Sequence, residues 1–273
     1  MTLNIWKNDR NFEIEEHEEQ RRYYVVEHND LISKARQDLT ARELKLMDFV
    51  ISKIKPSDTN FTKVNTSMYE LTKVLDLKRN GKTYSDLARN IGDLRKKEVL
   101  IYNKEKKSVT QTGWVSEATY EENGQIEILL SSKLAPYLLG LKDNYTQYLL
   151  HDTVQLNSKY AILLYKLMRE ADKDRGKKIT ILQGSPNDFM EWLGAPKTYD
   201  YGKLKDKILK KAIEEINLKI DDMDLEILQA KHGRKVIQVE IHNNWTVQKA
   251  IKENSENAPR ISMHNWLDDS LSI

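Results

Sequence analysis

Apolar residues recur along this chain at a nearly constant distance, and this recurrence constrains the fold more than any single motif. At an offset of 117 residues, Leu39 corresponds to Leu156 and Leu46 corresponds to Leu163. Three apolar blocks repeat in the same order, which predicts two copies of one folding module. The other matching pairs are Met47 with Leu164, Val50 with Leu167, Leu87 with Leu204, Ile91 with Ile208, Val99 with Ile216, Ile101 with Leu218 and, at an offset of 118, Leu71 with Phe189 and Leu75 with Leu193.

The first copy is predicted to form three helices followed by a β-hairpin. Thr40, with Glu43 three residues later, has the pattern of a capping box, and this helix is expected to stop before Pro56. Two further helices are expected over residues 66–75 and 83–97. The β-branched stretches that follow, with E-N-G-Q as a turn, predict the hairpin.

The second copy repeats this order of elements. Asn157 is expected to begin a helix, Ser185 with the following proline opens a second helix, and Gly194 is its expected stop. Asp200 then caps a lysine-rich helix, which is followed by a strand, a glycine-containing turn and a strand. A helix, a helix–turn–helix and a hairpin make a winged helix. The predicted fold class is therefore α+β and helix-rich, with two tandem winged-helix domains related by internal duplication.

Charge divides the chain further. Residues 1–30 hold four basic and eight acidic residues and are expected to form an acidic arm, whereas the middle of the chain, up to residue 248, holds 37 basic and 30 acidic residues. An acidic arm on a basic body indicates a polyanionic partner. We place the winged-helix domains at 31–145 and 146–248 and a tail at 249–273. Residues 131–155 are not rich in Gly or Ser and predict a structured joint.

Composition excludes several functional classes. The 273 residues include no cysteine, which rules out disulfides, Fe–S clusters and thiol catalysis. No apolar run approaches the ~18 residues that cross a bilayer, and the N-terminus lacks the apolar core of a signal peptide. We therefore expect a cytoplasmic protein that has no membrane contact and uses no cofactor.

Motifs of enzymes or metal sites are incomplete in this sequence. A rolling-circle nickase needs a His-x-His metal site beside its tyrosine, and none of the six histidines has that spacing. The G-K-T sequence at Gly81 is not a P-loop, because Asp76 stands where the loop needs its first glycine. The E-E-H-E-E sequence at 15–19 is interpreted as part of the solvated arm rather than as a cation site. We expect no enzymatic activity.

The lysine-rich helix is the candidate functional element. At about 100° per residue, Lys207, Lys210 and Lys211 fall within roughly 80° of Lys203, opposite an apolar side. A solvated face is the plain alternative, but such a face usually alternates charges at i,i+4, whereas here the lysines repel one another. We therefore favour contact with DNA. The apolar side comprises Leu204, Ile208, Leu209, Ala212, Ile213 and Ile216.

Individual roles follow from position on a helix that enters the major groove. Lys203 and Lys207 are candidates for base edges, and Lys210 and Lys211 for phosphates. Gly202 at the helix start lets the backbone approach phosphates. Neighbouring candidates are Tyr199 and Tyr201.

Two further basic regions are candidates for phosphate contact. The turn of the second hairpin, K-H-G-R-K, carries Lys231, Arg234 and Lys235, and a solvated turn is an equally good interpretation. In the first copy the equivalent helix is less basic, and a structural or dimerisation role is as plausible as phosphate contact. Its candidates are Arg89, Lys96 and Lys97, with Lys104, Lys106 and Lys107 in what we interpret as its wing.

Three stretches together resemble one family. L-T-A-R-E-L-K-L-M-D-F-V-I-S-K-I-K-P, L-N-S-K-Y-A-I-L-L-Y-K-L-M and G-K-L-K-D-K-I-L-K-K-A-I-E-E-I-N resemble plasmid replication initiators of the two-winged-helix, iteron-binding class, over roughly residues 31–245. The resemblance implies a protein that binds direct repeats in a plasmid origin, helps to open the duplex, recruits the host initiator and replicative helicase, and represses its own gene as a dimer. It also implies that Lys203, Lys207, Lys210 and Lys211 read the repeat, and that the region 89–107 of the first module grips the backbone and carries the dimer interface.

Two other interpretations remain. A transcriptional repressor of the same fold would need a fixed dimer and a palindromic operator, whereas two modules in one chain suit direct repeats. Alternatively, the first copy serves only for protein interaction. Two modules reaching successive major grooves about 10 bp apart predict a monomer footprint of roughly 20 bp.

Overall fold

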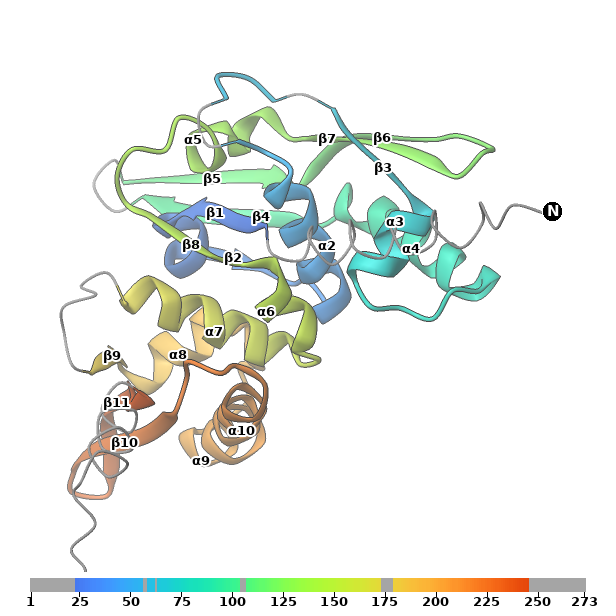
Figure 1. Cartoon of the computed structure of the whole chain (residues 1–273). Helices are drawn as coiled ribbons and strands as arrows, with labels where there is room; N and C mark the ends of the chain where they lie inside the picture. The colour runs from blue at the N-terminus through green and yellow to red at the C-terminus, as the bar shows by residue number, and fades with distance from the viewer. Residues whose placement is uncertain (1–22, 56–57, 62, 104–106, 173–178, 246–273) are drawn as a thin grey trace, which may run out of the picture.

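The computed structural model describes residues 23–55, 58–61, 63–103, 107–172 and 179–245 (Figure 1). The predicted tail, 249–273, and most of the predicted acidic arm lie outside these residues. The described part of the arm is not separate from the first domain, because it contributes a strand. That strand, β1 (Tyr24–His28), pairs antiparallel with β8 (Tyr145–Leu149) in a two-stranded sheet.

The first module follows β1 and contains the predicted helix and helix–turn–helix. Thr40 forms the predicted capping box, since its hydroxyl accepts from the Glu43 amide and its own amide donates to Glu43 Oε2. The elements in chain order are η1 (Asp30–Lys34), β2 (Ala35–Gln37), α2 (Ala41–Ser52), β3 (Val64–Ser67), α3 (Met68–Val74), α4 (Gly81–Leu94), β4 (Glu98–Asn103), β5 (Ser108–Gly113), β6 (Val115–Tyr120) and β7 (Gln125–Leu130).

Two helix starts in this module differ from prediction. The helix expected from Thr66 begins at Met68, because residues 64–67 form β3, and Ser67 caps α3 instead. The helix expected from Thr83 begins two residues earlier, because the Asn80 side chain accepts from the Thr83 amide. Both differences come from a neighbouring polar side chain that takes the cap, one residue after Thr66 in α3 and three residues before Thr83 in α4.

The joint predicted at 131–155 is structured. It contains η2 (Ser132–Leu134), α5 (Ala135–Leu138), β8 and α6 (Leu150–Gln155). The second module continues with α7 (Lys159–Ala171), β9 (Thr180–Gly184), α8 (Pro186–Trp192), α9 (Tyr201–Leu204), η3 (Lys205–Leu209), α10 (Lys210–Lys219), β10 (Leu225–His232) and β11 (Lys235–Asn243).

Matching sheets confirm that the two modules share one architecture. In the first module the strand order is β3-β7-β6, and in the second it is β9-β11-β10, so the strand before each helix–turn–helix pairs with the second strand of a hairpin. Matching turns support the predicted duplication: Asp76 follows α3 with φ 53°, and Gly194 follows α8 with φ 56°. The N-caps Ser67 and Ser185 are 118 residues apart, as are Thr40 and Ser158.

The single hairpin predicted for the first module is in fact two hairpins. The β4–β5 pair joins β2 in an additional three-stranded sheet, and the hairpin equivalent to β10–β11 is β6–β7. Consequently the predicted pairings of Val99 with Ile216 and Ile101 with Leu218 are wrong. Val99 and Ile101 are buried in β4, whereas Leu218 lies on a helix and is 82% exposed.

Candidate nucleic-acid interface

The lysine-rich segment is one continuous helix, α9–η3–α10, with a π turn in its middle. The predicted cap is confirmed, because the Asp200 side chain accepts from the Lys203 amide at 2.8 Å. Within the helix, the Lys210 amide donates to the Lys205 carbonyl, five residues back rather than four. This pattern defines the π turn, which places one more residue in that turn than an α-helix would.

The two predicted sides of this helix are confirmed. The apolar residues from Leu204 to Ile216 are all buried in the second module, and Lys203, Lys207, Lys210 and Lys211 are exposed. Lys205 is only half-buried on the apolar side, and its Nζ donates to Gln229 Oε1 at 3.3 Å.

The π turn explains how these two sides stay separate. On a regular α-helix, Leu204 and Lys211 would lie only about 20° apart, although one is fully buried and the other is exposed. Leu204 and Ile213 would lie about 180° apart, although both are buried. One extra residue in the π turn reduces the second angle to about 80° and moves Lys211 to about 120° from Leu204. The π turn therefore turns the following lysines toward solvent.

The lysines differ in their neighbours. Lys210 Nζ lies 2.8 Å from Asp206 Oδ1, and this hydrogen bond lowers the pKa of Asp206. Lys207 Nζ lies 5.8 Å from the centre of the Tyr199 ring, a cation–π contact. Lys203 and Lys211 form no ion pair with any residue that the structure describes. At Lys203 and Lys211 the exposed face thus carries positive charge that no described carboxylate pairs with.

The start of the helix is held against the adjacent hairpin. The Tyr201 hydroxyl donates to Gln229 Oε1 on β10 at 2.8 Å, and burial raises the pKa of Tyr201, so the hydroxyl keeps its proton. Gly202 is exposed, and a Cβ there would meet only the Asp200 carboxylate at 3.4 Å. The contact fixes the angle between helix and hairpin, while the open side at Gly202 leaves the backbone accessible.

The second hairpin ends in the predicted basic turn. Lys231, Arg234 and Lys235 are exposed, and Gly233 between them has φ 61°, the left-handed region that favours glycine. The pairing of β10 with β11 shifts register between Ala230 and Lys231, a bulge that bends the hairpin just before this turn. The second module therefore carries two basic surfaces, the lysine side of its helix and this turn.

The candidates of the first module are more strongly engaged with neighbouring residues. Arg89 Nη1 lies 3.3 Å from Asp86 Oδ1 and Lys96 Nζ lies 3.8 Å from Asp93 Oδ1, each an exposed basic side chain beside a half-buried carboxylate. Lys97 Nζ donates to the buried Glu43 carboxylate at 2.7 Å and to the Asp38 carbonyl at 2.9 Å. Because the Lys97 ammonium supports the capping box of α2, we omit Lys97 from the proposed interface.

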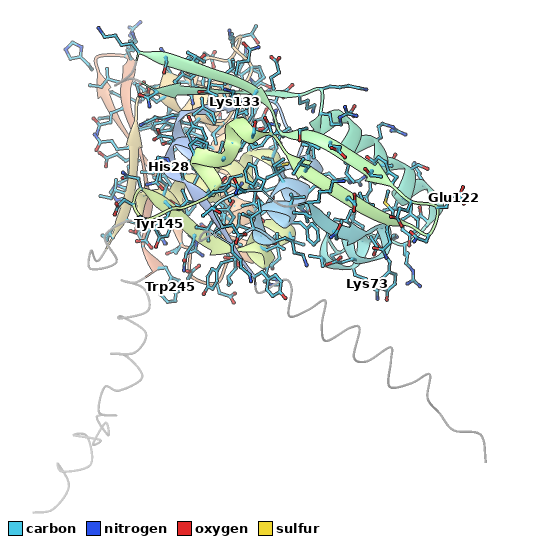
Figure 2. All side chains as sticks on the ribbon, turned by 90° about the horizontal axis from the view of Figure 1, so that it is seen from above. His28, Lys73, Glu122, Lys133, Tyr145 and Trp245 are labelled. Atoms are coloured by element: carbon cyan, nitrogen blue, oxygen red, sulfur yellow. The ribbon has the colours of Figure 1, made fainter. Side chains whose placement is uncertain are left out.

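The hairpin of the first module has the opposite charge from the one predicted. Lys107 belongs to the β4–β5 connection, and Lys104 and Lys106 lie outside the described residues. The true equivalent of the second wing is β6–β7, whose turn carries exposed Glu121 and Glu122. Figure 2 shows Glu122 at the far end of this hairpin, and in Figure 1 the β10–β11 hairpin lies at the opposite end of the molecule. The adjacent E-E-N-G turn was the sequence signal for this acidic wing.

The part of the chain that the structure describes lacks two other features. No group of three or more His, Cys, Asp or Glu side chains there has an arrangement that would hold a metal ion. Over the same residues, no helix combines the length and apolarity that crossing a bilayer requires.

Comparisons with known proteins agree with this geometry. Residues 24–169 match the family described as Initiator Replication protein, WH1, and residues 185–243 match Initiator Rep protein, WH2. The structure of the Pi initiator protein in complex with iteron DNA is 17% identical and has a TM-score of 0.69, covering 82% of this chain and 97% of that one. Domains 2 and 3 of RctB cover 77% of this chain and 84% of theirs, at 8% identity and a TM-score of 0.45. The chain therefore belongs to the family of replication initiator proteins built from two winged-helix domains.

Proposed function

We propose that this initiator binds direct repeats, the iterons, at a plasmid origin, with α9–η3–α10 in a major groove. The observation that carries the proposal is the exposed lysine face on the second helix of the second helix–turn–helix. Such a helix enters a major groove about 12 Å wide, where side chains reach base edges. Lys203 and Lys207 are assigned to bases, and Lys210 and Lys211 to phosphates.

The second wing and the first module complete the proposed interface. We call α9–η3–α10 the recognition helix. Beside it, Lys231, Arg234 and Lys235 contact the DNA backbone or the minor groove. Tyr199, Tyr201 and Gly202 shape the entry of that helix. In the first module, Arg89 on α4 and Lys96 just after it supply phosphate contacts, since both side chains are themselves exposed and an ion pair near the surface holds them only weakly. The solved Pi initiator bound to iteron DNA supports the choice of ligand.

Events after DNA binding are also part of this proposal. By resemblance to the family, the protein opens the duplex, recruits the host initiator and replicative helicase in the cytoplasm, and represses its own gene as a dimer. The free energy of DNA binding drives opening through bending, because bending a duplex costs only a few kcal/mol. Any ATP-driven motor belongs to a partner.

Competition binding tests this function against the rival repressor. The protein is titrated with equal-length duplexes from its own plasmid origin that carry direct repeats, inverted repeats or scrambled sequence, at several salt concentrations. We expect the direct repeats to bind about 10³-fold or more tightly than scrambled DNA, the lower range for specific binding proteins. Preference for a single inverted repeat would support a repressor instead, and equal binding to all three would refute sequence-specific recognition.

A further inference from the structure

Helix α7 is the first helix of the second module, yet it also packs against the first. In Figure 1 it lies between the first module and the recognition helix. It contacts α2, η1 and β8 on one side and α10 and β9 on the other. The match to the first family domain extends to residue 169 and so includes most of this helix. Helix α7 is therefore shared by the two modules.

On the side of the first module, Lys166 of α7 enters a buried cluster. Its Nζ lies 2.6 Å from Asp48 Oδ1 on α2 and 3.3 Å from Glu27 Oε1 on β1. The Tyr148 hydroxyl on β8 lies 2.7 Å from Glu27 Oε1 and 3.1 Å from Asp48 Oδ1. All four side chains are almost completely buried. The cluster therefore joins α2, β1 and β8 to α7.

The hydrogens in this cluster can be counted. A phenol has one hydrogen, so Tyr148 can donate to only one of its two carboxyl neighbours. The shorter of its two contacts is to Glu27 Oε1, at 2.7 Å, and burial raises the pKa of Glu27 despite the nearby Lys166. The Lys166 ammonium lies between the two carboxyl groups and forms ion pairs with both.

On the side of the recognition helix, Arg169 of α7 enters a second cluster one turn further on. Its two terminal nitrogens lie 2.7 Å from the two oxygens of Asp222, which follows α10. One of them also lies 3.3 Å from Asp152 on α6, and Nε donates to the Tyr165 hydroxyl. The rings of Tyr148 and Tyr165 meet edge to face at 5.7 Å and link the two clusters.

The N-terminus of α7 is held from both modules as well. Glu215 on α10 accepts from the Asn157 amide at 2.6 Å and the Ser158 amide at 3.1 Å. Just before α7, Lys45 on α2 donates to the Val154 carbonyl at 2.6 Å, and Lys219 on α10 donates to the Gln155 carbonyl at 2.8 Å.

Such contacts fix position more than they add stability. A buried ion pair gains little net free energy because desolvation offsets attraction, but displacing one partner leaves a buried charge without compensation. Sliding or rotating α7 against either module would break these contacts together.

We infer that α7 is a rigid spacer that sets the distance and rotation between the two DNA-reading modules, with Lys166 and Arg169 as positioning residues. The inference rests on the proposed function, in which both modules contact one repeat. A rigid spacer makes the protein select the length of the repeat as well as its base sequence. One added base pair rotates the two halves by about 34° and separates them by about 3.4 Å, so both modules no longer fit at once.

The test measures the spacing penalty, defined as the loss of affinity when one base pair is added to or removed from the centre of a repeat. Wild-type protein is compared with Lys166→Met and Asp222→Asn, all as full chains. The matched control is Glu70→Gln, which removes the ion pair of Glu70 with Lys53 at 2.9 Å inside the first module. Thermal unfolding establishes that each variant is folded.

We expect a wild-type penalty of roughly tenfold or more, the same penalty in Glu70→Gln, and a penalty several-fold smaller in the two α7 variants. Loss of stability alone would not change this ratio, because both DNAs bind the same folded protein. The side chain of Asp222 is 44% exposed, so Asp222→Asn is expected to fold. This variant therefore provides the test if Lys166→Met does not fold.

Other outcomes separate this inference from the proposed function. If folded variants keep the wild-type penalty, or if the wild type has no penalty, α7 is not a spacer although repeat binding stands. If the wild type does not prefer the unaltered repeat over scrambled DNA, the proposed function itself is wrong.

Discussion

Lys203 and Lys207 point from the first half of the recognition helix, and we predict that they read bases. Replacing either with alanine should reduce the preference for the repeat over scrambled DNA by about 1–3 kcal/mol if the lysine contacts a base by two hydrogen bonds. Affinity for scrambled DNA should fall much less. Competition binding with both DNAs measures the two effects separately.

Lys211 serves as the matched comparison, since it is also an exposed lysine without an ion pair among the described residues. Lys211→Ala should weaken binding to repeat and scrambled DNA alike. It should also reduce the slope of log affinity against log salt by about 0.9, the effect of one lost phosphate contact. If Lys203→Ala and Lys211→Ala behave identically, the assignment of bases and phosphates along the helix is wrong.

Glu27 gives the buried cluster a dependence on pH. Burial raises its pKa in the folded protein above the ordinary 4.5, although Lys166 opposes the shift. A carboxyl with a raised folded pKa contributes stability at pH below 4.5 and loses it as the pH rises through the folded pKa. Glutamine mimics the protonated form and does not titrate.

The free energy of unfolding of Glu27→Gln relative to wild type should therefore increase as the pH rises above 4.5, and it should level off once the pH exceeds the folded pKa. Urea unfolding at several pH values measures it, and Glu70→Gln is the control for loss of a carboxylate in the same module. A difference that stays constant with pH would show that Glu27 is not protonated in the fold.

At the scale of elements, we predict that removing a charge from the turn of each wing has opposite effects on DNA affinity. Arg234→Ala in the β10–β11 turn should weaken binding to all DNA, by about 1 kcal/mol for a phosphate contact. Glu122→Ala in the β6–β7 turn should leave affinity unchanged or raise it slightly, because it removes negative charge. Filter binding at low salt compares them. Equal losses in both variants would mean that the first wing also contacts DNA.

Local signals predicted three helix caps correctly, whereas the helix expected to begin at Asn157 is capped by Ser158. Thr40 with Glu43, Ser185 before Pro186, and Asp200 each cap a helix as predicted, because a cap depends on residues three positions apart. The buried and exposed sides of the recognition helix also followed from its own sequence, and so did the basic turn after Lys231.

Long-range pairing explains what the sequence did not predict. Which of two consecutive hairpins pairs with β3 depends on sheet contacts, so Lys104, Lys106 and Lys107 were assigned to the wing although the predicted E-N-G-Q turn belongs to β6–β7. Lys97 looked like a surface lysine because nothing local shows that Glu43 and the Asp38 carbonyl lie beside it. The π turn was hidden because a regular helical wheel still places the lysines and the apolar residues on two arcs, although Leu204 and Lys211 then lie side by side at their border.

At the scale of the whole molecule, the boundary between domains was the hardest feature to predict. The sequence placed it at 145–146, whereas β8 pairs with β1 of the first module and α7 is held by side chains of both. Because α7 belongs to both modules, the sequence shows no change of composition where one domain ends and the next begins. The helix joins the two modules through buried contacts, and this arrangement suits a protein whose two reading modules must fit one repeat together.

Footprinting on the origin DNA of its own plasmid tests the central claim most directly. We predict protection of several repeats in the same orientation, each about two helical turns or roughly 20 bp long, because one chain presents two modules about one turn apart. Protection should weaken together at all repeats as salt rises. A single protected inverted repeat, or protection of only one turn per site, would contradict the account of a two-module initiator on direct repeats.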